Sequence, residues 1–171
     1  MESEWPLRPT SAVVPANAGI QTRRSTAFRL LGPRVRGEDG IHSQPLTASR
    51  FEDLDLYREA FRLQQAVYAL SKRFPAAERY SLTDQMRRAS RSVGANVAEA
   101  WRKRRHPAHF VSKLSDADAE LAETRHWLHT ASACGYVEAV AYAALCSAAD
   151  SVGKKIGAMI RDPRRWTPRG L

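Results

Sequence analysis

The sequence predicts an all-α protein, an antiparallel up-down-up-down four-helix bundle preceded by a disordered N-terminal leader. Apolar residues recur at alternating spacings of four and three along four successive segments, and proline or glycine separates each segment from the next. No segment has the apolar-polar alternation of a half-buried strand. Short connections make helices that are neighbours in sequence run in opposite directions, so four such helices form an antiparallel bundle.

The first two predicted helices lie on either side of Pro75. The first covers about residues 51–74 and ends there, because proline cannot donate the backbone hydrogen bond of an interior helical residue. Its apolar positions are Leu56, Ala60, Leu63, Val67, Leu70 and Phe74. The second begins near Ser81, a residue type that caps helix N-termini, and ends near Arg102. Its inward positions are Leu82, Met86, Ala89, Val93 and Val97.

The third and fourth predicted helices are separated by Gly135, which is expected to stop the third. The third opens near Pro107, since proline is favoured in a first helical turn. Its inward positions are Phe110, Leu114, Ala117, Leu121, Thr124, Leu128 and Ala131. The fourth runs from about Val137 to Arg161 and ends before Pro163. Its inward positions are Ala141, Leu145, Ala148, Val152, Ile156 and Met159.

The 171 residues have room for one ordinary domain. We expect a leader over residues 1–49, the bundle over residues 50–162 and a basic C-terminal tail over residues 163–171. The leader is rich in proline and glycine and has no persistent apolar period, so it is expected to be disordered. Residues 14–21 and 32–39 resemble the translation of a dispersed bacterial intergenic repeat, which suggests a start codon assigned too far upstream. The alternative is a basic arm, because the first 50 residues hold seven arginines against four acids.

The two cysteines are expected to be reduced. Cys134 falls at a predicted turn and Cys146 about nine residues along the next helix, which separates them by more than the ~7 Å that a disulfide tolerates between Cα atoms. No apolar run approaches the roughly 18–20 residues that span a bilayer, and no secretory signal opens the chain. We therefore expect a cytoplasmic protein without a membrane partner.

The histidines do not predict a metal site. His106 and His109 form one pair and His126 and His129 another, about 20 residues apart on one predicted helix. That separation is about 30 Å, too far for both pairs to bind one ion. The sequence also has no nucleophile with a paired base and no glycine-rich phosphate loop. No catalytic residue, no cofactor and no enzymatic activity are predicted.

The formal charge of +9 is concentrated in one segment. Residues 79–105 hold eight basic and two acidic residues, whereas the rest of residues 51–171 holds twelve of each. Arginines spaced three and four apart reach one helix face, where a phosphate backbone or an acidic surface would relieve their repulsion. The guanidinium also binds phosphate with two hydrogen bonds. The predicted nucleic-acid-binding residues are Arg87, Arg88, Arg91, Arg102, Lys103, Arg104 and Arg105. The alternatives are a solvated basic face or pairing with carboxylates of another chain.

A polar stripe is predicted beside these arginines. Ser92, Asn96 and Glu99 are spaced four and three apart on the second helix, and Asn96 is expected on its inward side. A polar residue near a helix contact fixes register or oligomeric state at some cost in stability, so the stripe is assigned a structural role.

Several motifs resemble those of a known family. They are Phe51-Glu52-Asp53-Leu54, Phe74-Pro75, Glu78-Arg79-Tyr80-Ser81-Leu82-Thr83, Gln85-Met86-Arg87-Arg88-Ala89, Asn96-Val97-Ala98-Glu99 and Gly135-Tyr136. Over about residues 51–161 the chain resembles the four-helix-bundle proteins also called 23S ribosomal RNA intervening-sequence proteins. It departs from their pattern at Glu99-Ala100, where Glu-Gly is usual, and around Ala117-Asp118-Ala119, where Gly-Ser is expected.

The resemblance implies a small bundle that assembles as a ring-shaped homopentamer. Most members have no assigned activity. One branch, the accessory protein of diversity-generating retroelements, is similar in fold, and its basic pentamer binds a reverse transcriptase and its RNA.

The expected function is therefore that of a non-enzymatic homo-oligomer that binds nucleic acid, RNA rather than DNA, through its basic second helix. It would act as a ribonucleoprotein or reverse-transcriptase adaptor. The expected partners are nucleic acid, further copies of the chain and, by the resemblance, a reverse transcriptase. The alternative is a protein-interaction scaffold whose basic face pairs with acidic partner or subunit surfaces.

Overall fold

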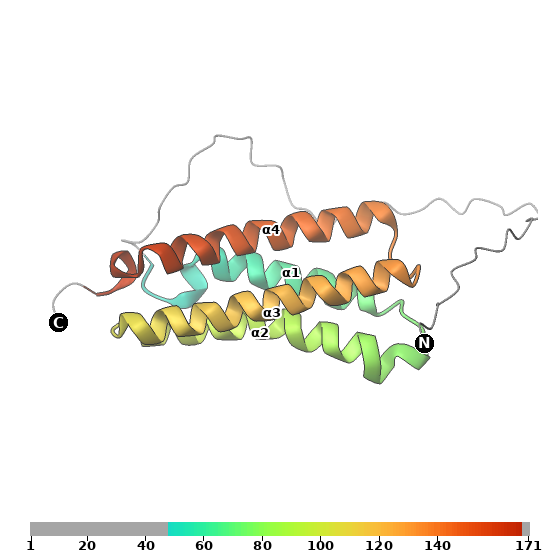
Figure 1. The fold of residues 1–171 in the computed structure, drawn as a ribbon, viewed down its shortest axis with the longest axis horizontal. Helices are drawn as coiled ribbons and strands as arrows, with labels where there is room; N and C mark the ends of the chain where they lie inside the picture. Colours follow the sequence, from blue (N-terminus) through green and yellow to red (C-terminus); the bar gives the residue numbers. More distant parts are fainter. Residues whose placement is uncertain (1–47, 169–171) are drawn as a thin grey trace, which may run out of the picture. The chain divides into compact units, whose positions relative to one another are not determined.

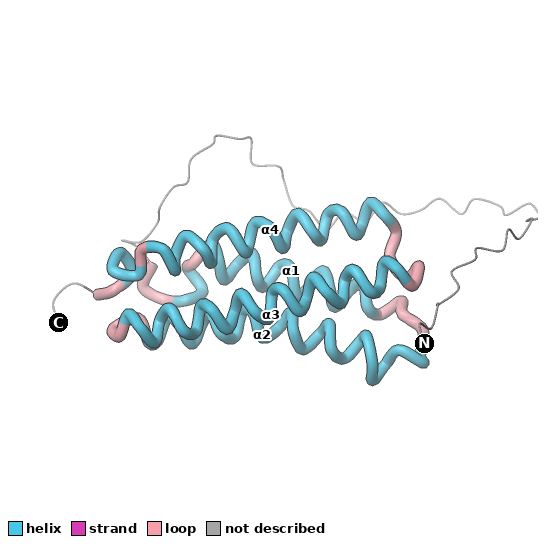
Figure 2. The backbone as a smooth tube through the Cα atoms, in the orientation of Figure 1, coloured by secondary structure: helices cyan, strands magenta, loops and turns pink. Residues whose placement is uncertain are grey.

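The computed structural model describes residues 48–168, and the regular structure in this part of the chain is helical throughout (Figure 2). The long helices are α1 Asp55–Ser71, α2 Asp84–Lys103, α3 Pro107–Ala133 and α4 Ala139–Arg161. Short 3-10 turns cover Phe51–Asp53, Ala76–Glu78 and Pro163–Trp166, and a π-helical turn covers Arg79–Thr83. The predicted all-α class is confirmed for the described residues. Most of the predicted leader and the last three residues of the predicted tail lie outside them.

The four helices lie side by side around a common core. Helix α2 packs against α1 and α3, and α4 packs against the same two helices. The colours in Figure 1 run in one direction along α1 and α3 and in the other along α2 and α4. One side of each helix therefore faces the core and the other faces solvent. The solvent-facing side of α2 is bordered by α1 along one edge and by α3 along the other.

The buried residues follow the predicted spacing closely in α3. All seven positions predicted to point inward are buried, and Phe110, Leu114 and Leu128 are among the largest fully buried side chains. In α1 the predicted positions are buried as far as Val67, while Leu70 and Phe74 are only half-buried. Helix α1 ends at Ser71, so Phe74 lies in the connection to α2.

One core position of α4 was predicted wrongly. Ala148 is exposed, and Ala149 is fully buried in its place. Two adjacent alanines are equally apolar, so composition cannot choose between them. Either alanine completes an alternation of three and four between Leu145 and Val152, so the spacing does not choose between them either.

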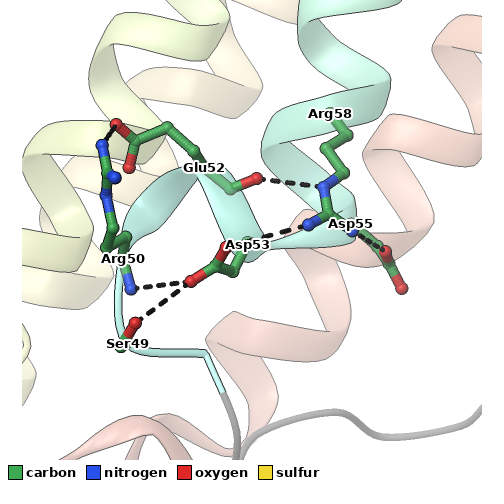
Figure 3. Close-up of polar contacts among 6 residues, drawn as sticks. All are labelled: Ser49, Arg50, Glu52, Asp53, Asp55 and Arg58. Carbon is green, nitrogen blue, oxygen red and sulfur yellow. Dashed lines mark hydrogen bonds and ion pairs between the residues drawn. The ribbon is translucent and has the colours of Figure 1, made fainter.

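Polar side chains before and within the first turn of α1 surround the start of the helix (Figure 3). The carboxylate of Asp53 accepts hydrogen bonds from the Ser49 hydroxyl at 3.3 Å and from the Arg50 backbone N–H at 3.1 Å. One helical turn into α1, the Arg58 guanidinium donates to the backbone carbonyl of Glu52 at 3.0 Å. These bonds hold residues 49–53 against the first turn of α1.

The predicted N-terminal cap of α2 at Ser81 is wrong. Ser81 lies within the π-helical turn, and its hydroxyl donates to the Glu78 carboxylate at 2.5 Å. The backbone is already helical at Thr83, so the first residues of α2 continue a helix and need no side-chain cap. Glu78 also accepts a hydrogen bond from the Tyr136 hydroxyl at 3.2 Å. This bond ties the α1–α2 connection to the α3–α4 turn.

Gly135 ends α3 as predicted. Its φ of +75° lies in the left-handed region that glycine adopts without strain. The N–H of Gly135 donates to the carbonyl of Ser132 at 3.0 Å, and the N–H of Tyr136 donates to that of Ala131 at 2.9 Å. This pair of bonds is the Schellman motif, which satisfies the last carbonyls of a helix and turns the chain sharply.

Candidate nucleic-acid interface

Helix α2 has a well-packed core face, and its basic residues lie on the side that faces solvent. Met86, Val93 and Val97 are buried beneath it, which fixes the rotation of the helix. The predicted basic residues separate into two groups, one at Arg87, Arg88 and Arg91 and the other from Arg102 to Arg105. Arg91 and Arg102 are eleven positions apart, about 16 Å at the rise of an α-helix. The interface is therefore two clusters rather than one continuous stripe.

The cluster near the start of α2 surrounds an aromatic ring of α1. The Lys72 Nζ lies 4.6 Å from the centroid of the Tyr68 ring, and the guanidinium carbons of Arg87 and Arg91 lie 5.0 and 5.9 Å from it. The Nε of Arg87 also donates to the buried Ser71 hydroxyl at 2.7 Å, which fixes that side chain. We call Tyr68, Lys72, Arg87 and Arg91 the Tyr68 cluster.

Arg88 lies on the other side of this part of α2. It is exposed and forms no ion pair within the described residues. Its charge acts on Glu120 of α3, where it lowers the pKa of the carboxyl. Desolvation and the neighbouring Glu123 outweigh that effect, so the pKa of Glu120 is raised overall. The first group of arginines thus spans the solvent side of α2 from the α1 edge to the α3 edge.

In the cluster at the end of α2, two basic side chains already contact other groups of the same chain. Lys103 pairs with Glu99 at 2.6 Å, and Glu99 also pairs with Lys113 of α3 at 3.0 Å. Arg104 donates to the Trp101 carbonyl at 2.7 Å, and its guanidinium carbon lies 4.0 Å from the centroid of the Trp101 ring. A cation that binds the last carbonyls of a helix stabilises its C-terminus.

The electrostatics of this second cluster follow from these contacts. Hydrogen bonds from Lys103 and Lys113 lower the pKa of the Glu99 carboxyl. Burial lowers the pKa of the Arg104 guanidinium, and the like charges of Arg102 and Arg105 lower it further. Arg102 and Arg105 are exposed and have no carboxylate partner among residues 48–168. They are the two cations of this cluster that remain available to a ligand.

The predicted polar stripe lies at the edge of the core. Ser92, Asn96 and Glu99 are half-buried, so Asn96 is not fully inside as expected. An angle of about 100° per residue places Asn96 to one side of the inward-facing Val93 and Val97. No hydrogen bond joins the three side chains within the described part of the chain, and Glu99 turns to the lysines instead. A role of the stripe in register or assembly stays a prediction.

Other predicted features are located as follows. Cys134 and Cys146 are both free thiols. The part of the chain that the structure describes holds no group of three His, Cys, Asp or Glu side chains placed to bind a metal ion. None of the helices in residues 48–168 is long and apolar enough to cross a bilayer.

Sequence reasoning missed Tyr68 and Lys72 as members of the interface. The two residues are four apart on the exposed side of α1, a spacing that predicts a contact between them. Their meeting with Arg87 and Arg91 depends on how α1 and α2 pack, for which the sequence carries no comparable signal. Ser71, which holds Arg87, was likewise not singled out.

The fold of the described residues places the chain among the small all-α bundle proteins. The family model of the 23S rRNA-intervening sequence protein matches residues 52–158. The chain belongs to this family, and the resemblance seen in the sequence is confirmed.

One solved structure with the same fold is a protein of unknown function from the S23 ribosomal protein family of Bacteroides thetaiotaomicron VPI-5482. It is 22% identical, with a TM-score of 0.57, and the match covers 62% of this chain and 98% of that one. No curated protein matches the chain. The two departures from the family pattern place fully buried alanines, Ala100 and Ala117, in the core of the bundle.

Proposed function

We propose that this protein is a non-enzymatic RNA-binding bundle that contacts the phosphate backbone through α2 and the turn after it. The observation that carries the proposal is a set of exposed arginines with no carboxylate partner among the described residues. They are Arg88, Arg91, Arg102 and Arg105. A guanidinium can form two hydrogen bonds with one phosphate, and such contacts need no particular base sequence.

The finer parts of the proposal concern assembly and partners. A homo-oligomer, a pentamer by family resemblance, would repeat the basic surface and multiply the affinity of a weak single-chain site. Such a particle would act in the cytoplasm as an adaptor, holding RNA for a ribonucleoprotein or a reverse transcriptase. The excess of positive charge in residues 79–105 supports this role, because it steers polyanions toward α2.

A protein-interaction scaffold is the second candidate. The observation that favours it is the exposed acidic surface of α3, which includes Asp116, Asp118 and Glu123. These carboxylates could pair with α2 arginines of another copy of the chain. In that case the arginines would hold subunits together and would be covered in the oligomer.

The test measures the affinity of the full chain for a structured RNA at several salt concentrations. The test variant is Arg88→Ala/Arg91→Ala, and the control is Lys154→Ala/Arg161→Ala, which removes the same charge from exposed positions of α4. We expect the test variant alone to weaken binding and to reduce the slope of log affinity against log salt by about 0.7–0.9 for each phosphate that the variant no longer binds.

Light scattering of the same variants separates the two candidates. An unchanged oligomer with weakened RNA binding supports the RNA-binding proposal. Dissociation of the oligomer on charge reversal of Arg88 and Arg91 supports the scaffold. A wild-type chain that binds no RNA at low salt, or binds it independently of salt, overturns the RNA-binding proposal.

A further inference from the structure

We infer that the Tyr68 cluster binds an unpaired nucleotide, whose base stacks on Tyr68 while Lys72, Arg87 and Arg91 hold the adjoining phosphates. This inference rests on the proposed RNA binding and specifies its ligand: single-stranded RNA, or an unpaired segment within a folded one. It also assigns a role to an aromatic residue that lies outside the basic segment of the sequence.

The position of the ring supports the inference. Tyr68 is 37% exposed on α1, and three cations, one just after the end of α1 and two on α2, lie within 6 Å of its centroid. The hydrogen bond from Arg87 to Ser71 anchors one of these cations, so the cluster is organised before a ligand arrives. Single-stranded nucleic acids are bound by this combination, in which cations follow the backbone and an aromatic face receives a base.

A second exposed ring continues the surface along α1. Phe61 is 45% exposed and precedes Tyr68 by seven residues, which places it on nearly the same helix face about 10 Å away. Phe61 stacks on Tyr57 with a centroid separation of 6.3 Å. Tyr57 in turn borders α2, because a Cβ at Gly94 would lie 3.7 Å from its ring. The exposed rings of α1 therefore follow the side of the helix that faces α2.

The presence of the ring favours an unpaired ligand over a duplex. The bases of a duplex are stacked on one another, so an aromatic side chain on a basic surface gains nothing from them, whereas an unpaired base can stack on it. In the free protein the three cations make cation–π contacts with the Tyr68 ring. Exposed cation–π contacts are weaker than base–aromatic stacking, and the phosphates of the ligand attract the same cations. A base can therefore replace a cation at the ring.

The experiment compares a fluorescent single-stranded oligoadenylate with an RNA duplex of equal length, using the full chain at several salt concentrations. We expect Tyr68→Ala to weaken single-strand binding by about 5- to 100-fold and to leave duplex binding within about twofold. The salt slope should not change, since stacking releases no counterions. Tyr68→Phe keeps the ring and should bind like the wild type.

Two further variants keep the test decisive. Tyr68→Leu fills similar space without an aromatic face, so it should lose single-strand affinity even if Tyr68→Ala perturbs the fold. Tyr80→Ala removes a tyrosine that is 83% exposed outside the cluster and should bind like the wild type. Circular dichroism checks that each variant remains helical.

The outcomes separate this inference from the proposed function. A wild-type chain that binds neither RNA contradicts the proposed function and the inference with it. If the wild type binds but Tyr68→Leu binds single strands equally well, the inference alone is overturned. It is also overturned if the Tyr68 variants weaken single strands and duplexes alike with a smaller salt slope, because the tyrosine would then act only by positioning the arginines.

Discussion

The two basic clusters of α2 are built around different kinds of aromatic residue. Near the start of the helix, Lys72, Arg87 and Arg91 surround Tyr68, whose ring is partly open to solvent. At the end, Arg104 covers Trp101, whose side chain is 4% exposed and belongs to the core. A cation over a core residue stabilises the bundle, whereas Lys72 and Arg91 beside an exposed ring can exchange partners while the Ser71 hydroxyl holds Arg87.

A basic residue in the charged segment is therefore not always available to bind a ligand. The segment from 79 to 105 carries the excess of positive charge, yet Lys103 and Arg104 are committed to Glu99 and to the end of α2. Their neighbours Arg102 and Arg105 remain exposed. Neighbouring basic residues at the end of α2 thus have different roles: some bind groups of the bundle, and others face solvent.

The largest expected difference between the two clusters is the loss of stability when the aromatic residue of each is replaced by alanine. Trp101→Ala leaves a cavity in the core and removes the ring beneath Arg104, so we expect a loss of about 3–5 kcal/mol in the free energy of unfolding. Tyr68→Ala removes an exposed ring and should cost less than about 1 kcal/mol. Urea unfolding monitored by circular dichroism measures both, and equal losses would contradict the distinction between a core ring and a surface ring.

Pairs of charges within the second cluster should differ in their effect on RNA binding. Arg102→Ala/Arg105→Ala removes two available cations and should reduce the salt slope of RNA affinity by about 1.4–1.8. Lys103→Ala/Arg104→Ala removes the same charge from residues already engaged in the bundle and should reduce the slope less. Fluorescence anisotropy over a salt series provides the comparison. Equal reductions would mean that internal pairing does not limit phosphate binding.

The fold could be predicted from the sequence because burial follows helical spacing. All seven inward positions predicted for α3 are buried, and Gly135 stops that helix with the backbone conformation expected of it. The prediction failed where spacing gives no unique answer. Ala148 and Ala149 are chemically equivalent, and Ser81 resembles a cap although the backbone is already helical before α2 begins.

The candidate site could be predicted only in part. The charge of a segment can be read from the sequence, whereas contacts between helices depend on how the helices pack. Arg87, Arg88, Arg91 and Arg102 lie on α2 and Arg104 and Arg105 follow its end, whereas their binding of nucleic acid stays a prediction. The pairing of Lys103 with Glu99 follows from a spacing of four and was open to prediction. Tyr68 meets Arg87 only because α1 lies against α2 at that height.

Release of the internally paired lysines should increase RNA binding. Glu99→Gln removes the carboxylate that holds Lys103 and Lys113, so both ammonium groups become available to phosphate. We expect a rise of a few-fold in RNA affinity at low salt, with a steeper salt slope than that of the wild type. The control is Asp118→Asn, which removes one exposed negative charge that makes no hydrogen bond or ion pair in the described structure. Equal gains from the two variants would assign the effect to net charge alone.

The same carboxylate should leave a small signature in the acid stability of the bundle. Hydrogen bonds from Lys103 and Lys113 hold the pKa of Glu99 below its ordinary value of 4.5. A carboxyl with a lowered folded-state pKa stabilises the protein above its unfolded-state pKa, and this contribution is lost as the pH falls through the folded value. Between pH 6 and pH 3, the urea midpoint of Glu99→Gln should therefore fall less than that of the wild type, with the divergence beginning near pH 4.5. Parallel curves would mean that Glu99 does not hold Lys103 and Lys113 in solution, and that both ammonium groups are already available to a ligand.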